Sequence, residues 1–261
     1  MKPLCVLTIA GSDSGAGAGI QADARTMQAL GGFALAAITA VTAQNTRGVI
    51  SWRAEPPALI AAQIEAVLND FSVAAIKTGL LPSAAAVRAV AVAVKRYPRI
   101  PLVVDPVIGS TSGTRFLSVN GVEALADQLL PRAAVVTPNW PEAAILSGLS
   151  VRDFDGAEKA ARAILKTGCA AVLVKGGHAR GKQVRDVLVT ADGRLRWFEG
   201  SRIQTRNTHG TGCVLSAAIA AGLAKGAKVA KAVDAARDFL RRGLEAGKGV
   251  RLGSGAGPAL F

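Results

Sequence analysis

Short apolar runs alternate along the chain with segments whose apolar residues recur at helical spacing. The runs of strand length lie at residues 4–11, 33–44, 74–79, 101–107, 133–139 and 170–177. One helical pattern follows each of the first four runs, at residues 20–30, 56–70, 83–97 and 120–130, and two follow the fifth, at residues 140–148 and 155–168. A parallel strand is buried on both faces and needs a crossover helix before the next one. The pattern therefore predicts a mostly parallel sheet with helices on both faces.

The C-terminal third departs from this alternation. Residues 184–200 place "DG" between two alternating runs, which predicts a β-hairpin. Two helical patterns follow at about 211–225 and 228–246. We find no internal repeat, linker or low-complexity segment, so residues 1–261 are expected to form a single α/β domain.

Composition narrows the class of protein. The 261 residues are 50% hydrophobic, enough for a sizeable core, and no 18-residue apolar run lacks polar interruption, so no membrane contact is expected. Three cysteines, Cys5, Cys169 and Cys213, make an odd and widely spaced set. They argue against a disulfide framework and for a reducing cytoplasm. Two histidines without metal-ligand spacing make a zinc site improbable.

The net charge of +13 is unevenly distributed. Residues 1–150 carry 11 Lys and Arg against 9 Asp and Glu (+2), and residues 151–261 carry 20 against 9 (+11). A basic half suggests an anionic partner, either nucleic acid or a phosphate-rich small molecule. Aromatic residues make up only 4%, and the basic residues are dispersed, which argues against nucleic acid. A basic solvated surface remains the simplest explanation for most of this charge.

Polar residues and glycines follow the predicted strands. After the six strands come "GSDSGAGAG", "AQN", "KTG", "DP", "TPN" and "KGG". Ligands of open α/β sheets bind at the carboxyl ends of the strands. Gly, Pro, Asn and Asp also punctuate ordinary loops, which suffices to explain any single one of these loops. Six successive strands that all end in such polar loops favour an active site along this edge of the sheet.

The first glycine loop, residues 11–19, resembles known phosphate-binding loops only superficially. The dinucleotide pattern G-x-G-x-x-G fails because Ile20 occupies the third glycine position, and the Walker pattern fails for lack of a lysine. Two interpretations remain: a flexible loop that caps a helix, or a loop that lets the backbone approach a small substrate. In the second case Asp23 would accept a hydrogen bond from a substrate hydroxyl.

The segment "NTHGTGC" (207–213) carries the stronger signal. Gly210 and Gly212 allow a tight loop whose N–H groups, with the start of the following helix, form an anion hole. The helix dipole should lower the pKa of Cys213, and such a thiol can act as a general base. A small buried cysteine is an equally good interpretation of the spacing.

Two further segments allow a functional and an ordinary interpretation. Asn139 and Glu142 in "TPNWPEA" share a helical face and could hold waters around Mg²⁺. By themselves they fit helix capping better. Lys175, at the end of "VLVK", would either meet a nucleotide phosphate or lie in solvent.

These segments together carry a family resemblance. They are "TIAGSDSGAGAGIQAD", "VTAQNT", "KTGLL", "VVDPV", "TSG", "TPNWPEA", "VLVKGGH" and "THGTGCVLSAAIAA". In order and spacing, from about residue 4 to about residue 240, the chain resembles bacterial hydroxymethylpyrimidine/phosphomethylpyrimidine kinases of the ribokinase-like superfamily. The cysteine of "HGTGC" stands where most ribokinase-like enzymes carry Asp.

The resemblance implies a fold and an activity. The fold would be a three-layer α/β/α sandwich around a mostly parallel sheet. The activity would be phosphorylation of 4-amino-5-hydroxymethyl-2-methylpyrimidine, and then of its monophosphate, by ATP with Mg²⁺ in thiamin biosynthesis. Relatives are commonly dimers, so a homodimer is expected.

The resemblance also implies site residues. Asp23 and Gln44 would bind the pyrimidine or its hydroxymethyl group, with Leu80 and Val107 against the ring. ATP and its phosphates would meet Thr137, Asn139, Lys175 and Arg237, the last of which often is Lys in the family. Asp105 and Glu142 would hold Mg²⁺ through water. Gly210, Thr211 and Gly212 would form the anion hole, with Cys213 as the base.

Three alternatives remain. A vitamin B6 kinase of the same superfamily would phosphorylate a pyridoxine-type alcohol of similar shape. A sugar kinase would be expected to carry Asp at position 213. A ligand sensor without catalysis, or a nucleic-acid-binding protein, would not need Asp23, Lys175 and the "GTGC" loop together.

Overall fold

The computed structural model describes residues 4–110, 113–179 and 181–261, and nine strands within them form one sheet. The strands follow the order β3-β2-β1-β4-β5-β6-β7-β8-β9. Their bounds are β1 Leu4–Asp13, β2 Gly32–Asn45, β3 Gly48–Ala54, β4 Val73–Thr78, β5 Leu102–Val104, β6 Val135–Val136, β7 Ala171–Val174, β8 Gln183–Thr190 and β9 Leu195–Ser201. The central pairs from β2 to β7 are parallel. The outer pairs β2–β3, β7–β8 and β8–β9 are antiparallel.

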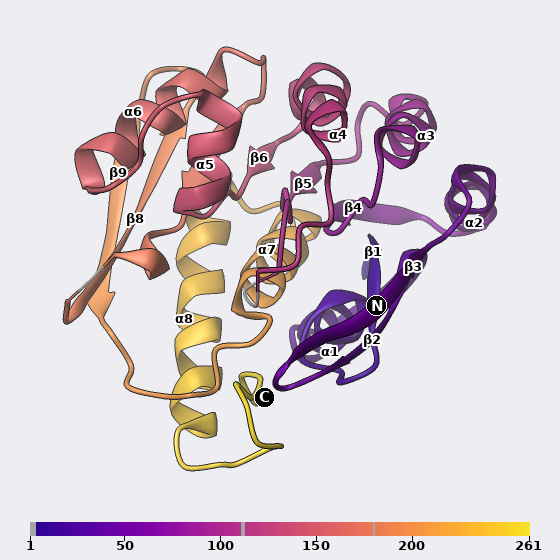
Figure 1. Cartoon of the computed structure of the whole chain (residues 1–261). Helices are drawn as coiled ribbons and strands as arrows, with labels where there is room; N and C mark the ends of the chain where they lie inside the picture. Colours follow the sequence, from indigo (N-terminus) through magenta and orange to yellow (C-terminus); the bar gives the residue numbers. More distant parts are fainter. Residues whose placement is uncertain (1–3, 111–112, 180) are drawn as a thin grey trace.

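Helices cover both faces of this sheet (Figure 1). Their bounds are α1 Gly19–Ala29, α2 Pro57–Asp70, α3 Ala84–Lys95, α4 Val119–Ala124, α5 Trp140–Ser147, α6 Phe154–Leu165, α7 Thr211–Ala224 and α8 Val229–Gly247. One apolar core joins α2 to α6 with the sheet, and a second joins α1, α7 and α8 with the opposite face. Successive side chains of β5 show the division: Leu102 and Val104 enter the first core, and Val103 enters the second.

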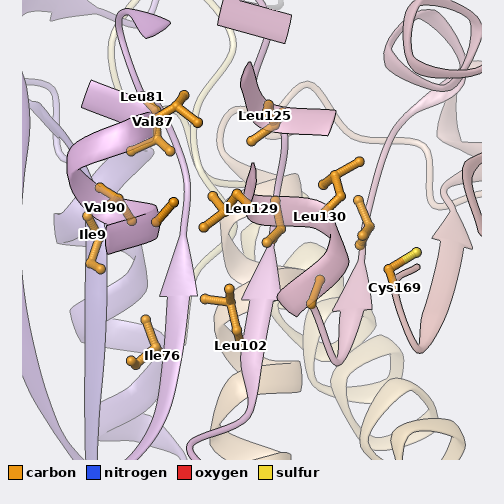
Figure 2. Close-up of a cluster of buried hydrophobic side chains, with 14 of the residues drawn as sticks. Ile9, Ile76, Leu81, Val87, Val90, Leu102, Leu125, Leu129, Leu130 and Cys169 are labelled. Carbon is orange, nitrogen blue, oxygen red and sulfur yellow. The ribbon is translucent and has the colours of Figure 1, made fainter. Parts of the chain in front are cut away.

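The first core is the larger of the two. Figure 2 shows side chains from three neighbouring strands, Ile9, Ile76 and Leu102, directed toward the covering helices. Val87 and Val90 of α3 pack there at helical spacing and are fully buried. The predicted three-layer, mostly parallel architecture is confirmed, as are the hairpin of β8 and β9 and the two C-terminal helices.

The structure departs from the prediction at two places, one strand that was missed and one helix that was wrong. Strand β3 was not predicted; it adds an antiparallel edge to β2, and because its Ile50 is 76% exposed, its pattern lacks the burial signal of an inner strand. The helix expected at 120–130 is interrupted: α4 continues as one wide π turn, Leu125–Leu129, and a 3₁₀ turn, Leu130–Arg132. Pro131 accounts for the second break, because proline has no N–H for the helical ladder.

The C-terminal segment after α8 is irregular, but it is packed against the rest of the chain. The N–H of Ala256 donates to the carbonyl of Thr46, and the N–H of His209 donates to the carbonyl of Gly257. The Phe261 ring stacks on Phe239 of α8 with centroids 4.5 Å apart. The segment therefore connects the β2–β3 turn, the loop before α7 and α8.

No helix within the described part of the chain is long and apolar enough to span a lipid bilayer.

Candidate active site

A cavity of about 540 Å³ opens at the carboxyl ends of the parallel strands. Its wall includes residues from the ends of β1, β2, β4 and β5 and from the start of α7. This volume lies within the range of small-molecule sites. The predicted rim at the strand ends is thus a real concave surface.

The glycine loop after β1 is held by Asp13. One carboxylate oxygen accepts from the N–H of Gly15 at 2.8 Å, and the other accepts from Gly17 at 3.0 Å and Ala18 at 2.8 Å. His209 Nε2 lies 2.9 Å from the second oxygen. Burial opposes ionisation, but the hydrogen bonds from His209, Ala18 and Gly15 outweigh it and lower the pKa of Asp13.

An apolar wall with one amide forms the adjoining part of the cavity. Leu80 packs with Phe116 and Val107, and Gln44 at the end of β2 lines the same space. Val107 has φ of 38°, a backbone conformation that β-branched residues rarely adopt. The structure places three of the four predicted substrate residues, Gln44, Leu80 and Val107, on this wall.

Asp105 and Lys175 form a buried ion pair that also lines the cavity. Lys175 Nζ donates to Asp105 Oδ1 at 2.8 Å, and Ser216 of α7 donates to Asp105 Oδ2 at 3.1 Å. Burial would raise the pKa of Asp105, but Lys175 and Lys77 lower it overall. A Cβ on Gly212 would stand 3.1 Å from Lys175 Nζ, so only glycine lets the lysine reach the start of α7 without displacement.

Asn139 and Glu142 form a capping box at the start of α5. Asn139 Oδ1 accepts from the N–H of Glu142, and Glu142 Oε2 accepts from the N–H of Asn139, both at 2.9 Å. The capping interpretation is therefore confirmed. Both residues also line the cavity. Burial raises the pKa of Glu142, Lys175 opposes the rise, and the nearby carboxylate of Asp105 adds to it.

Asp105 and Glu142 are the two residues predicted to hold Mg²⁺, and both line the cavity. Within the described ranges, no group of three or more His, Cys, Asp or Glu side chains has the arrangement of a metal site. Three donors already hold Asp105, and a backbone N–H holds Glu142. Such engaged carboxylates fit Mg²⁺ through its bound waters better than by direct ligation.

The loop before α7 has the geometry of an anion hole. Gly210 is the N-cap of α7 with φ of 72°, and a Cβ there would overlap the carbonyl oxygen of Gly17. The N–H groups at the start of α7 have no helical acceptors, and the helix dipole places positive charge there. Gly210, Thr211 and Gly212 all line the cavity together with Lys175.

The prediction of an acidic thiol at Cys213 was wrong. Burial raises the pKa of Cys213 to about 11, and the carboxylates of Asp23 and Asp105 add to the rise. Lys77 opposes it without reversing it. The side chain does line the cavity beside Gly212, so its position agrees with the prediction while its protonation state does not.

Asp23 does not lie where it was expected. Its carboxylate is fully buried, accepts from Lys77 Nζ at 2.7 Å and from Thr8 Oγ1 at 2.6 Å, and is absent from the cavity wall. Asp23 of α1 is held by side chains of β1 and β4 and does not face the opening. Lys77, which is fully buried on β4, reaches the cavity wall instead.

Two expected phosphate contacts are also displaced. Thr137 is fully buried, and its hydroxyl donates to Asp105 Oδ1 at 3.2 Å. Arg237 Nε donates to Asp186 Oδ2 at 2.7 Å, and the same carboxylate accepts from the N–H of Gly176. Neither residue lines the cavity, so Thr137 orients Asp105 and Arg237 holds the segment after Lys175.

Three residues of the site had no role in the sequence prediction: Asp13, His209 and Lys77. Asp13 is the last residue of β1, and Asp105 comes directly after β5. This shared position at a strand end was the sequence signal that could have marked Asp13 as a site residue. His209 stands beside the anion-hole glycines, but its partner Asp13 is 196 residues away. Lys77 sits within an apolar strand, where a charged residue indicates a buried partner.

Comparison with known proteins agrees with this architecture. The *Bacillus subtilis* pyridoxal kinase solved as an ADP complex has a TM-score of 0.92 and 34% identity, covering 99% of this chain and 97% of that one. The phosphomethylpyrimidine kinase from *Clostridium difficile* 630 has a TM-score of 0.80 and 37% identity, covering 91% and 98%. Such neighbours define the fold class as that of the ribokinase-like small-molecule kinases.

The sequence comparisons are more specific. A curated hydroxymethylpyrimidine/phosphomethylpyrimidine kinase of *Rhizobium meliloti* (strain 1021) is 48% identical over 254 residues, 97% of this chain and 94% of the relative. The family model described as phosphomethylpyrimidine kinase matches residues 13–260. The chain belongs to the phosphomethylpyrimidine kinase family.

Proposed function

We propose that this chain uses ATP and Mg²⁺ to phosphorylate 4-amino-5-hydroxymethyl-2-methylpyrimidine, and then its monophosphate, to the pyrophosphate. The observation that carries the proposal is the composition of the cavity. One part of the cavity is an apolar wall with a single amide, formed by Leu80, Val107 and Gln44. It adjoins the anion hole, where Gly212 lies beside the ammonium group of Lys175. Such a cavity fits a flat polar ring whose hydroxymethyl group points toward a phosphoryl donor, and family membership supports the pyrimidine.

The phosphoryl group would be held at the start of α7. The N–H groups of Gly210, Thr211 and Gly212, together with Lys175, would offset the charge on the oxygens of the group in transfer. The transition state of phosphoryl transfer is loose, so positioning and charge stabilisation supply most of the acceleration. Asn139 lines the same part of the cavity and would contact the nucleotide.

Mg²⁺ would neutralise part of the charge of the ATP phosphates. Asp105 and Glu142 would hold it through water, which fits their existing hydrogen bonds better than direct ligation. Thr137 and Ser216 contribute by fixing the orientation of the Asp105 carboxylate. These two hydroxyls keep the carboxylate directed toward Lys175.

Cys213 would position the substrate alcohol. With a pKa of about 11, the thiol is protonated near neutral pH. A loose transition state needs little prior deprotonation of the alcohol. The thiol would therefore orient the hydroxymethyl oxygen toward the phosphoryl group, and the hydroxyl proton would pass late in the reaction to an oxygen of the transferred phosphoryl group.

ADP release with MgATP and each of three acceptors tests the proposal. The acceptors are the hydroxymethylpyrimidine, its monophosphate and pyridoxal. Turnover with both pyrimidines is the expected result. Turnover with pyridoxal alone would overturn the substrate assignment while keeping the kinase chemistry. Absence of turnover from folded protein would overturn both.

Vitamin B6 kinase is the second candidate, favoured by the TM-score of 0.92 with the *B. subtilis* pyridoxal kinase. A pyridoxine-type alcohol shares the flat ring and hydroxymethyl group, so the apolar wall would accept it. The ratio of kcat/KM for pyridoxal and for the pyrimidine decides between the two.

The remaining parts of the proposal concern the setting. The chain would act as a single ribokinase-like domain in a cytoplasmic homodimer, with small-molecule partners and no nucleic-acid partner. The dispersed basic residues support the absence of a nucleic-acid partner, and the odd set of cysteines supports a reducing cytoplasm. Size-exclusion chromatography with light scattering checks the dimer, and salt-dependent DNA binding without ATP turnover would contradict the small-molecule assignment.

A further inference from the structure

One ring nitrogen of His209 faces two side chains at hydrogen-bond distance. Its Nε2 lies 2.9 Å from Asp13 Oδ2 and 3.0 Å from Gln44 Nε2. A ring nitrogen of neutral imidazole either donates or accepts, and cannot do both. Asp13 decides whether His209 Nε2 is a donor or an acceptor. That choice in turn decides whether the oxygen or the nitrogen of the Gln44 amide should face His209.

Asp13 requires the donor form. Its carboxylate already accepts three backbone N–H groups, from Gly15, Gly17 and Ala18, an arrangement that stabilises the ionised form. A carboxylate has no proton to give, so His209 must donate from Nε2. An N–H at this position repels the NH₂ group of Gln44 and attracts its carbonyl oxygen.

Thr42 independently selects the same orientation. The hydroxyl of Thr42 lies 3.0 Å from the carbonyl of Ser12 and 3.4 Å from Gln44 Oε1, and it has one proton for the two acceptors. The shorter contact takes that proton, so only lone pairs of Thr42 face the Gln44 amide, and they do not suit an oxygen there. Those lone pairs attract the NH₂ group of Gln44. A 180° rotation of the amide exchanges its oxygen and nitrogen at almost no steric cost, so the two neighbours decide between the orientations.

We propose that Asp13 and His209 are positioning residues that orient the Gln44 amide with its carbonyl oxygen toward His209 and its NH₂ group toward Thr42. One N–H then binds Thr42, and the other is left for a ring-nitrogen acceptor of the substrate. Asp13, His209, Thr42 and Gln44 all line the cavity, which places this donor where the ring would lie. The inference rests on the proposed function only in assigning the ring to this wall.

The specificity that follows is chemical. A fixed donor selects an aromatic alcohol with an unprotonated ring nitrogen and discriminates against a carbocyclic ring of the same shape. A site that hydrogen-bonds its ligand rejects an analogue lacking the partner more strongly than an apolar pocket does. The Asp13–His209 pair thus determines what Gln44 can recognise, although neither residue needs to contact the substrate.

The first experiment measures the tautomer of His209 directly. The chain has two histidines, so ¹⁵N NMR of the imidazole rings in the full-length protein gives two spin systems, and a His178→Gln variant assigns them. Near neutral pH, His209 is expected to carry a proton on Nε2. An unprotonated Nε2 would overturn the inference, whatever the protein is found to phosphorylate.

A double-mutant cycle between His209 and Gln44 tests the functional consequence. In His209→Leu, KM for the hydroxymethylpyrimidine should rise about tenfold with a much smaller change in kcat. In the Gln44→Ala background the same substitution should change KM less than about twofold, because the amide it orients is gone. His209→Gln keeps a donor near the Nε2 position and should recover most of the affinity. Equal effects of His209→Leu in both backgrounds would overturn the positioning role.

Calorimetric titration of the pyrimidine without ATP separates the two hypotheses. Binding to the wild type with weaker binding to His209→Leu supports the positioning role. Equal binding by the two proteins contradicts it. Absence of binding to the wild type would contradict the proposed substrate, while the tautomer measurement would still decide the state of His209.

Discussion

Lys175 Nζ lies 2.8 Å from Asp105 Oδ1 and 3.1 Å from the point where a Cβ on Gly212 would stand. One ammonium group therefore joins the residue after β5, the residue after β7 and the start of α7. The three elements are far apart in the sequence, and the parallel sheet brings their ends to one edge. A phosphoryl group bound at this edge would meet the lysine and the N-terminal end of α7 together.

Lys175→Met should lower kcat by about 10²- to 10³-fold, because the group in transfer loses its principal cation. KM for the pyrimidine should change little, since Lys175 pairs with Asp105 and is not among the apolar residues Leu80, Phe116 and Val107 that would pack on the ring. Steady-state ADP release checks both parameters. Lys159→Met is the matched control, because Lys159 makes an exposed helical pair with Asp155. Wild-type kcat in Lys175→Met would contradict the phosphate role.

Gly210→Ala should abolish turnover and destabilise the protein. Residue 210 has φ of 72°, and a Cβ added there would overlap the carbonyl oxygen of Gly17, so the loop must move. Gly226→Ala is a matched control, since Gly226 has φ of 80° but no atom within 4 Å of a Cβ. The control should cost only about 1 kcal/mol of unfolding free energy and retain turnover. Urea denaturation and ADP release together test the pair, and equal losses would contradict the close approach of the two loops.

Cys213→Ala should lower kcat strongly with little change in substrate binding, because the thiol contacts the alcohol rather than the ring.

The alkylation rate of Cys213 in the wild type should rise about tenfold per pH unit between pH 6 and 9. The sign follows from the pKa of about 11: the thiol is protonated throughout this range, and the reactive thiolate increases with pH. Mass spectrometry of iodoacetamide-treated protein measures the rate. A plateau below pH 9 would restore the acidic thiol, and wild-type turnover in Cys213→Ala would exclude any role in catalysis.

Lys77→Met should lower the free energy of unfolding by about 3–5 kcal/mol, because it leaves the Asp23 carboxylate buried without its cation. The pair is fully buried, with Lys77 Nζ 2.7 Å from Asp23 Oδ2. The double variant Asp23→Leu/Lys77→Met should recover most of the loss, since no uncompensated charge remains. Urea denaturation measures all three proteins. A double variant as unstable as Lys77→Met would show that packing, rather than the unpaired charge, causes the loss.

The site was partly predictable because some of its chemistry is local. The anion hole at Gly210 and Gly212 depends on loop-and-helix geometry within one short segment, and the capping box of Asn139 and Glu142 spans four residues. Lys175 and Asp105 follow apolar strands, so the rule that ligands bind at carboxyl ends places both at one edge. The family resemblance added Gln44, Leu80 and Val107, for which the pattern alone offered no assignment.

Local sequence could not predict which polar residues are buried behind the site. Asp23, Thr137 and Arg237 each carry a side chain suitable for a substrate or phosphate, yet each is engaged by another residue of the protein. The difference between a buried partner and a cavity wall depends on the rotation of a helix or strand against its neighbours. Long-range packing sets that rotation.

The sequence by itself determined the alternation of strands and helices, the hairpin and the two C-terminal helices, because periodicity reports which faces each segment must bury. It also determined the anion-hole loop, whose geometry is local. Only the tertiary structure decided that Asp13 meets His209 across 196 residues and that Cys213 is surrounded by Asp23, Asp105 and Lys77. Hydrogen-bond partners and the pKa of a buried group depend on solvation and charge contributed by the whole fold, and no segment of the chain contains that information alone.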